Sequence, residues 1–155
     1  MQEQYAGEQL ELSPTQFVLG DFVFSLPENT PVVSLGRKFD GGWITIDLLN
    51  ELPVQQQTGR KLDEITLKCE WFGDEGMSAI ARLTALRDGG KPYTLIRGDG
   101  ASMGQWVLVS FETDESWVYQ GGKSMKQSVT ISLREFANRP VSAAAAGQKS
   151  NTESK

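Results

Sequence analysis

The side chains that most often carry out catalysis are scarce in this sequence of 155 residues. It contains no histidine, and Cys69 is its one cysteine. Within the chain, these counts exclude a Ser-His-Asp triad, a Cys-His pair, a zinc site with histidine ligands and an intrachain disulfide. We therefore expect no metal and no cofactor. We expect Cys69 to be a buried, inert thiol, because it lies in a run of alternating apolar residues.

Two pairs of neighbouring carboxylates remain as candidates for acid–base chemistry. Asp63 and Glu64 lie at the start of the alternating run, where adjacent side chains point to opposite faces of a strand. Asp74 and Glu75 lie where a helix is expected to begin, and acidic residues stabilise that end of a helix. Glycosidase chemistry instead needs two carboxylates about 5–10 Å apart in one cleft. We expect neither pair to be catalytic.

Two glycine-rich segments share only composition with phosphate-binding loops. In 98–104, the glycines are not followed by an expected helix. In 121–124, the sequence Gly-Gly-Lys-Ser lacks the upstream glycine of a Walker motif and is flanked by expected strands. Both segments are typical of turns.

Large apolar side chains gather in the segments 105–119 and 125–136, which are expected to form a long β-hairpin with its tip at 121–123. Trp and Tyr are enriched in protein interfaces. The three large rings of this hairpin, Trp106, Trp117 and Tyr119, could therefore belong either to the core or to a surface that contacts a partner.

The elements that would position this hairpin are several strands and one helix. Strict alternation over 64–71 predicts a half-buried strand. One helix is predicted over 73–90, with two glycines at its end. Its apolar stripe is formed by Met77, Ile80, Leu83 and Leu86.

The rest of the chain is expected to alternate between strands and loops. The segment 49–61, with its proline and glutamine run, predicts a long surface loop. Because strands precede and follow the helix without βαβ alternation, the fold class is α+β with mostly antiparallel pairing. The other expected strands are rich in Val, Ile, Phe or Tyr, and they lie at 16–26, 32–39, 43–48 and 92–96.

Charge and hydropathy limit the possible partners. The net charge is −5, whereas proteins that bind nucleic acid usually have a basic surplus. DNA is therefore expected at most as a passing cargo. No apolar run approaches the roughly 20 residues that span a bilayer, and the acidic first residues do not resemble a secretory signal. We expect no membrane partner.

Several short motifs, taken in their order and spacing, resemble the GpU family of tail proteins from contractile-tailed phages and R-type pyocins. The resemblance covers residues 17–136. The matching motifs are LGDFVFSL at 19–26, Leu35, Arg37, Trp43, LDEITL at 62–67, LRDGGKP at 86–92, Gly98, Gly100, GQWVL at 104–108 and TISL at 130–133.

The resemblance implies a fold and a structural role. The fold would be a tail-tube-like antiparallel β-sandwich with one flanking helix and a long C-terminal hairpin. Six copies would form a ring between the tail tube and the central baseplate hub, in the position of the pyocin ripcord protein. The hairpins of the six copies would meet in the subunit interfaces. The candidate interface residues are Trp106, Val107, Val109, Phe111, Trp117, Tyr119, Val129, Ile131 and Leu133. Its neighbours would be the tube protein, the hub protein, a LysM-type tail protein, the tape measure protein and the sheath. The protein would be made in the host bacterial cytoplasm and reside in the virion.

The resemblance also divides the chain into an N-terminal arm (1–16), a tail-tube-like domain (17–136) and a C-terminal extension (137–155). Two other functions stay open. One is a tail terminator ring at the head-proximal end of the tube, which composition cannot separate from the baseplate position. The other is a wall-degrading enzyme, which the absence of histidine and of a suitable acid pair disfavours.

Overall fold

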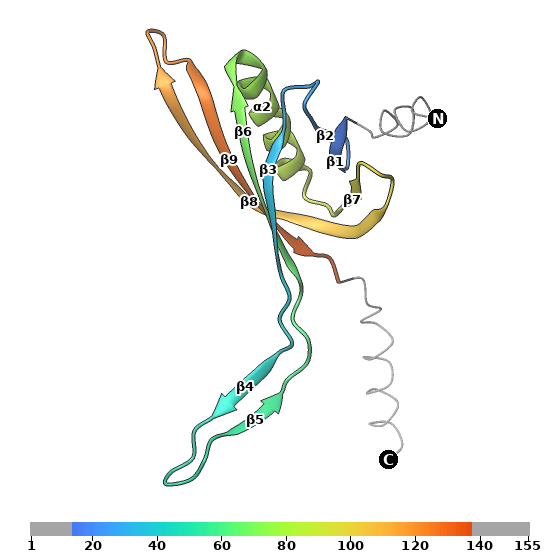
Figure 1. The fold of residues 1–155 in the computed structure, drawn as a ribbon, viewed down its shortest axis with the longest axis vertical. Helices are drawn as coiled ribbons and strands as arrows, with labels where there is room; N and C mark the ends of the chain where they lie inside the picture. Colours follow the sequence, from blue (N-terminus) through green and yellow to red (C-terminus); the bar gives the residue numbers. More distant parts are fainter. Residues whose placement is uncertain (1–13, 138–155) are drawn as a thin grey trace, which may run out of the picture.

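A computed structural model describes residues 14–137 (Figure 1). Within this range the chain forms nine strands and one helix. In chain order they are β1 (Thr15–Leu19), β2 (Phe22–Ser25), β3 (Val32–Lys38), β4 (Trp43–Ile46), β5 (Val54–Gln57), β6 (Glu64–Phe72), α2 (Gly73–Gly89), β7 (Tyr93–Arg97), β8 (Ser102–Val118) and β9 (Ser124–Glu135).

Seven of the strands form one sheet in the order β2-β1-β7-β8-β9-β6-β3, and all neighbours are antiparallel. The strands β4 and β5 form a separate two-stranded antiparallel sheet, which projects away from the body of the molecule (Figure 1). The predicted fold class, an antiparallel β-fold with one flanking helix and a long C-terminal hairpin, is confirmed.

The two layers of the sandwich are parts of the same sheet, which curves until its ends approach each other. The rings of Phe22 in β2 and Trp71 in β6 stack with centroids 5.8 Å apart, although these strands are not neighbours in the sheet. The side-chain amide of Gln16 in β1 accepts from the Val32 backbone N–H (2.7 Å) and donates to its carbonyl (3.1 Å). The Gln16 side chain thus makes the two hydrogen bonds to the β3 backbone that a neighbouring strand would otherwise make.

The core follows the predicted alternation of β6. Ile65, Leu67, Cys69 and Trp71 are buried, and between them Lys68 and Glu70 are exposed. The other buried apolar residues come from β1–β3, α2 and β7–β9: Leu19, Phe22, Phe24, Val32, Ala79, Leu83, Leu95, Trp106, Leu108, Val129, Ile131 and Leu133.

The helix α2 begins and ends where the sequence predicts. It has Asp74 and Glu75 in its first turn, and Gly90 after its end has left-handed backbone angles (φ 60°, ψ 33°). The predicted stripe is only partly correct, because the residues fully buried against the sheet are Gly76, Ala79 and Leu83. Met77, Ile80 and Leu86 are half-buried at the sides of this face.

The segment 49–61 is wrongly predicted to be a loop throughout, because it contains β5. This strand pairs with β4 in the register Trp43↔Gln57 to Ile46↔Val54. All residues of β5 are exposed. A strand without a buried face need not alternate apolar and polar residues, so the sequence pattern does not reveal it. The expected arms, 1–16 and 137–155, lie almost wholly outside the described residues.

Candidate assembly surfaces

The β8–β9 hairpin contributes to both the core and the surface. Of the predicted interface residues, Trp106, Val129, Ile131 and Leu133 are at most 1% exposed. They hold the sheet against α2 and cannot contact another subunit in the folded chain, which corrects their assignment as contact residues. Val107 and Phe111 are half-buried. The exposed members of the predicted set are Val109, Trp117 and Tyr119.

The four strands β8, β9, β6 and β3 have a free edge on each side. β7 pairs with β8 only from Ser102 to Trp106, whereas β9 follows β8 up to Val118. In the described part of the chain, no strand pairs with the other edge of β8 from Val107 to Val118. Likewise, β6 is the one described strand that pairs with β3. Such free edges readily pair with another chain.

The face of these strands that lies opposite the helix is polar. Cross-strand register places Thr66, Ser132 and Ser110 on one row, and Lys68, Thr130 and Glu112 on the next. Side chains of directly paired residues share a face. Charges of both signs therefore alternate with hydroxyl groups, so this face is not the acidic surface that the net charge alone would indicate.

The arm formed by β4 and β5 has exposed apolar side chains on both faces. Its register places Ile44, Ile46, Val54 and Gln56 on one face and Trp43, Thr45, Gln55 and Gln57 on the other. At its tip, Leu49 and Leu52 are 90% and 87% exposed. A lone two-stranded hairpin is at best marginally stable in water. Exposed apolar side chains on such an arm are typical of contact surfaces.

Two hydrogen bonds close the neck of the arm. The backbone N–H and the hydroxyl of Thr58 both donate to the Gly42 carbonyl, each at 2.8 Å. Gly42 has a positive φ of 78°, and a side chain here would clash with the Gly59 backbone. The neck therefore requires glycine at position 42.

A cluster of ion pairs joins the arm to the end of β9. The Arg60 guanidinium donates to both carboxylate oxygens of Glu135, at 2.8 and 3.1 Å, and the Asp63 backbone N–H donates to one of them at 3.0 Å. These hydrogen bonds lower the pKa of Glu135 from 4.5 to about 2. The same contact raises the pKa of Arg60. Asp63 also faces Arg60 (3.3 Å) and Arg37 (3.7 Å).

The residues that could do chemistry are held in structural roles. Asp63 belongs to the ion pairs above, and Glu64 accepts from Arg134 at 3.0 Å. Burial raises the pKa of Cys69 to about 12, so its thiol stays protonated, as predicted. Among residues 14–137, no group of three His, Cys, Asp or Glu side chains could hold a metal ion, and no helix is long and apolar enough to cross a membrane.

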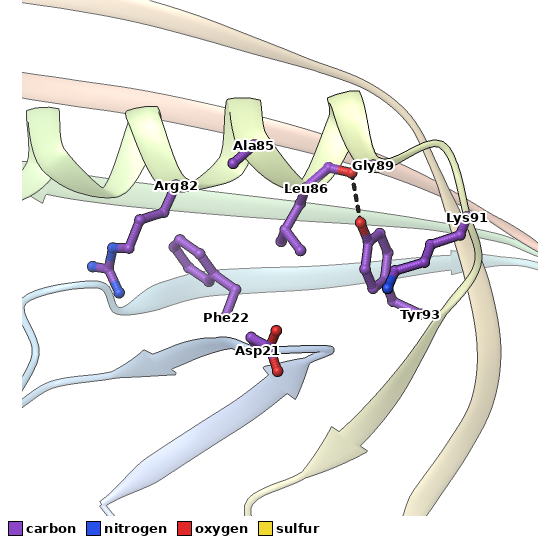
Figure 2. Close-up of a pocket in the computed structure, with 8 residues that line it drawn as sticks. All are labelled: Asp21, Phe22, Arg82, Ala85, Leu86, Gly89, Lys91 and Tyr93. Atoms are coloured by element: carbon purple, nitrogen blue, oxygen red, sulfur yellow. Dashed lines mark hydrogen bonds between the residues drawn. The ribbon is translucent and has the colours of Figure 1, made fainter.

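Two pockets flank the C-terminal end of α2. The larger, about 410 Å³, lies between α2, the β1–β2 turn and Tyr93, whose hydroxyl donates to the Leu86 carbonyl at 2.8 Å (Figure 2). The smaller, about 220 Å³, shares Leu86 and Lys91 with it. Its other lining residues are Arg87, Gly90, Pro92, Val107, Leu108 and Phe136. It therefore reaches the start of the free β8 edge.

Comparison with known proteins relates the chain to phage tails. The model of the family Phage P2 GpU matches residues 20–138. A protein of Halomonas phage phiHAP-1 described as a probable tape measure protein is 38% identical over 128 residues, which are 82% of this chain. This chain spans only 15% of that relative's length.

A solved structure shares the fold. The crystal structure of the Dit protein of phage SPP1, described as a paradigm of the hub adsorption apparatus in phages that infect Gram-positive bacteria, aligns with a TM-score of 0.53 at 11% identity. The alignment covers 77% of this chain and 49% of the Dit chain. At this identity the likeness concerns the fold alone.

Proposed function

This chain belongs to the Phage P2 GpU family and is a structural protein of a phage tail, and on that premise we propose that six copies close into a ring that joins the tail tube to the central hub of the baseplate. The observation that supports ring formation is the pair of free edges on β8 and β3. A heterologous contact between two different edges closes into a ring when the rotation between copies permits.

The strand directions suit this contact. From β8 through β9 and β6 to β3, each strand is antiparallel to the one before, so β8 and β3 run in opposite directions. The β3 edge of one copy would therefore pair with the β8 edge of the next in the antiparallel arrangement. Closure into a barrel removes free edges.

The polar face of the four strands would then line the lumen. The opposite face packs on α2 and the core, so it cannot face an open channel. Thr66, Thr130 and Ser132 are among the small hydroxyl side chains of the polar face. A lining of hydroxyl groups and mixed charges suits DNA as a passing cargo, because it offers phosphates no continuous basic track.

Axial neighbours would contact the two ends of the molecule. The arm, with its exposed leucines, lies at one end, and the hairpin tip with Trp117 and Tyr119 at the other (Figure 1). Apolar surfaces at both ends suit an adaptor between the tube and the hub. Family membership and the similarity to part of a probable tape measure protein support a tape measure protein as a further partner. We propose no catalytic role, since Asp63 and Glu64 are engaged in ion pairs.

The ring is tested by a charge at the β3 edge. Val33 is 63% exposed there, and Val33→Glu places a carboxylate where the next copy would pair. Leu26→Glu, at an equally exposed position in a turn, is the control. Native mass spectrometry and negative-stain microscopy of the full chain should show rings for the wild type and the control, and folded monomers for Val33→Glu. Rings that persist in Val33→Glu, or a wild-type chain that never forms rings, would contradict the proposal.

The position along the tail requires intact particles. Labelled copies of this chain should lie at the baseplate end of the tube. Label at the head-proximal end would instead favour the terminator ring.

A further inference from the structure

Phe39 is the first residue after β3, and its large apolar side chain borders a pocket whose other lining residues include Arg60, Asp63 and Glu135. It is 67% exposed, and its ring lies 4.7 Å from the Arg37 guanidinium. Arg37 pairs with the buried Ile65 and also lies 5.5 Å from the Trp106 ring, so it occupies the helix side of the sheet. Alternation places Phe39 on the same side.

The smaller pocket lies at the same level on the opposite edge of the four strands. Lys38 pairs with Glu64, Glu64 with Arg134, and Arg134 with Val107. The end of β3 and the start of the free β8 edge are therefore level with each other. Leu108, which pairs with the buried Leu133, lines the pocket together with Leu86 of α2, so the pocket opens on the helix side, where Phe39 also lies.

The matching level of the two free edges favours a second copy of this chain as the partner. Asp40, which follows Phe39, is acidic, whereas the neighbouring Arg37, Lys38 and Arg60 are basic. The charged residues that line the pocket, Arg87 and Lys91, are both basic. Arg87 contacts its neighbour Asp88 at 2.9 Å, and the Lys91 ammonium lies 5.8 Å from the centre of the Tyr93 ring.

We propose that Phe39 of one copy inserts into the pocket beside Pro92 of the next copy, with Asp40 facing Lys91 and Arg87. The inference rests on the ring proposed above and names the contact that fixes its register. The β3 edge cannot slide toward the beginning of β8, because β7 already pairs with β8 from Ser102 to Trp106. A buried aromatic anchor is typical of the residues that dominate interface energies.

Cross-linking tests which residues meet. In full-length Phe39→Cys/Lys91→Cys, a short bismaleimide should join successive copies into a ladder of covalent oligomers on a denaturing gel. Cys69 should not react, because it is buried and its thiol stays protonated. The control Leu49→Cys/Lys91→Cys places the first thiol on the exposed arm tip and should give no ladder. Rings that form without the ladder overturn this inference alone, whereas a wild-type chain without rings overturns the proposed function as well.

The energetic role of Phe39 is tested by truncation. Phe39→Ala should raise the concentration at which rings half-dissociate by about tenfold or more. Phe72→Ala removes an exposed ring at the far end of β6 and should leave that concentration unchanged. Circular dichroism should show that both variants are folded. Equal behaviour of the two variants in sedimentation would contradict a specific role for Phe39.

Discussion

At the level of single residues, Gly76 allows α2 to lie close to the sheet. A side chain at this position would clash with the Gln127 amide oxygen and lie 2.9 Å from the Trp71 Cβ. Gln127 is fully buried, and its amide nitrogen donates to the Ser124 carbonyl (2.9 Å) and hydroxyl (2.8 Å). These hydrogen bonds hold the Gln127 side chain in place, so it cannot move easily to make room for a larger residue at position 76.

Gly76→Ala should therefore destabilise the chain, although alanine is the better helix former by about 1 kcal/mol. Overpacking costs roughly 1–3 kcal/mol, so we expect a net loss of about 1 kcal/mol in the free energy of unfolding. Ser78→Ala, on the exposed side of the same turn, should be neutral or slightly stabilising. Urea denaturation of both variants measures the difference. Stabilisation by Gly76→Ala would contradict the close packing.

The Glu135 carboxylate makes the stability of the fold depend on pH. Hydrogen bonds from Arg60 and the Asp63 backbone lower its pKa from 4.5 to about 2 in the folded chain. A lowered pKa stabilises the fold above the unfolded-state value, and this contribution is lost as the pH falls from about 4.5 to about 2. Glu135→Gln should therefore have a lower thermal midpoint than the wild type at pH 6, and the two midpoints should converge toward pH 2.

The exposed carboxylate Glu28 supplies the control for this titration. Glu28→Gln should follow the wild-type curve of thermal midpoint against pH. If Glu135→Gln also followed it at every pH, the Arg60 contact would contribute nothing to stability.

At the level of elements, the arm and the body have separate tasks. The residues of β4 and β5 are all exposed, and the core lies within the seven-stranded sheet and α2. Thr58 and Gly42 meet at the neck, so the arm can be removed beyond them without stretching the chain. The exposed apolar side chains of the arm are then available for the axial contact proposed above.

Replacement of residues 43–57 by a short Gly-Ser turn should thus leave the body folded. We expect the free energy of unfolding to change by less than about 1 kcal/mol, because no buried side chain is removed. Tail assembly in a complementation assay should fail, since the partner surface is lost. Normal tails from this variant would show that the arm has no role in assembly, and an unfolded variant would show that the body depends on it.

At the level of the whole molecule, the same chain presents different surfaces in different directions. Strand edges at β3 and β8 face sideways, a polar face covers one side, and the arm and the hairpin tip form the two ends (Figure 1). In the proposed ring, each surface would contact a different neighbour: another copy, the lumen contents, or the proteins above and below.

Much of this organisation is determined by the sequence. Alternation in 64–71 places β6, acidic residues and glycines mark the ends of α2, and the order of short motifs identifies the family. These features are local, because periodicity and end signals are set by neighbouring residues. The inert thiol of Cys69 follows from the same alternation.

Other features were decided only by the tertiary structure. Trp106 and Trp117 lie on one strand and are both aromatic, yet one is buried and the other is 67% exposed, because α2 and the core cover only part of β8. The strand β5 exists through its pairing with β4, and the free edge of β8 begins where β7 ends. Pairing and burial depend on residues distant in the sequence, so composition and local periodicity cannot specify them.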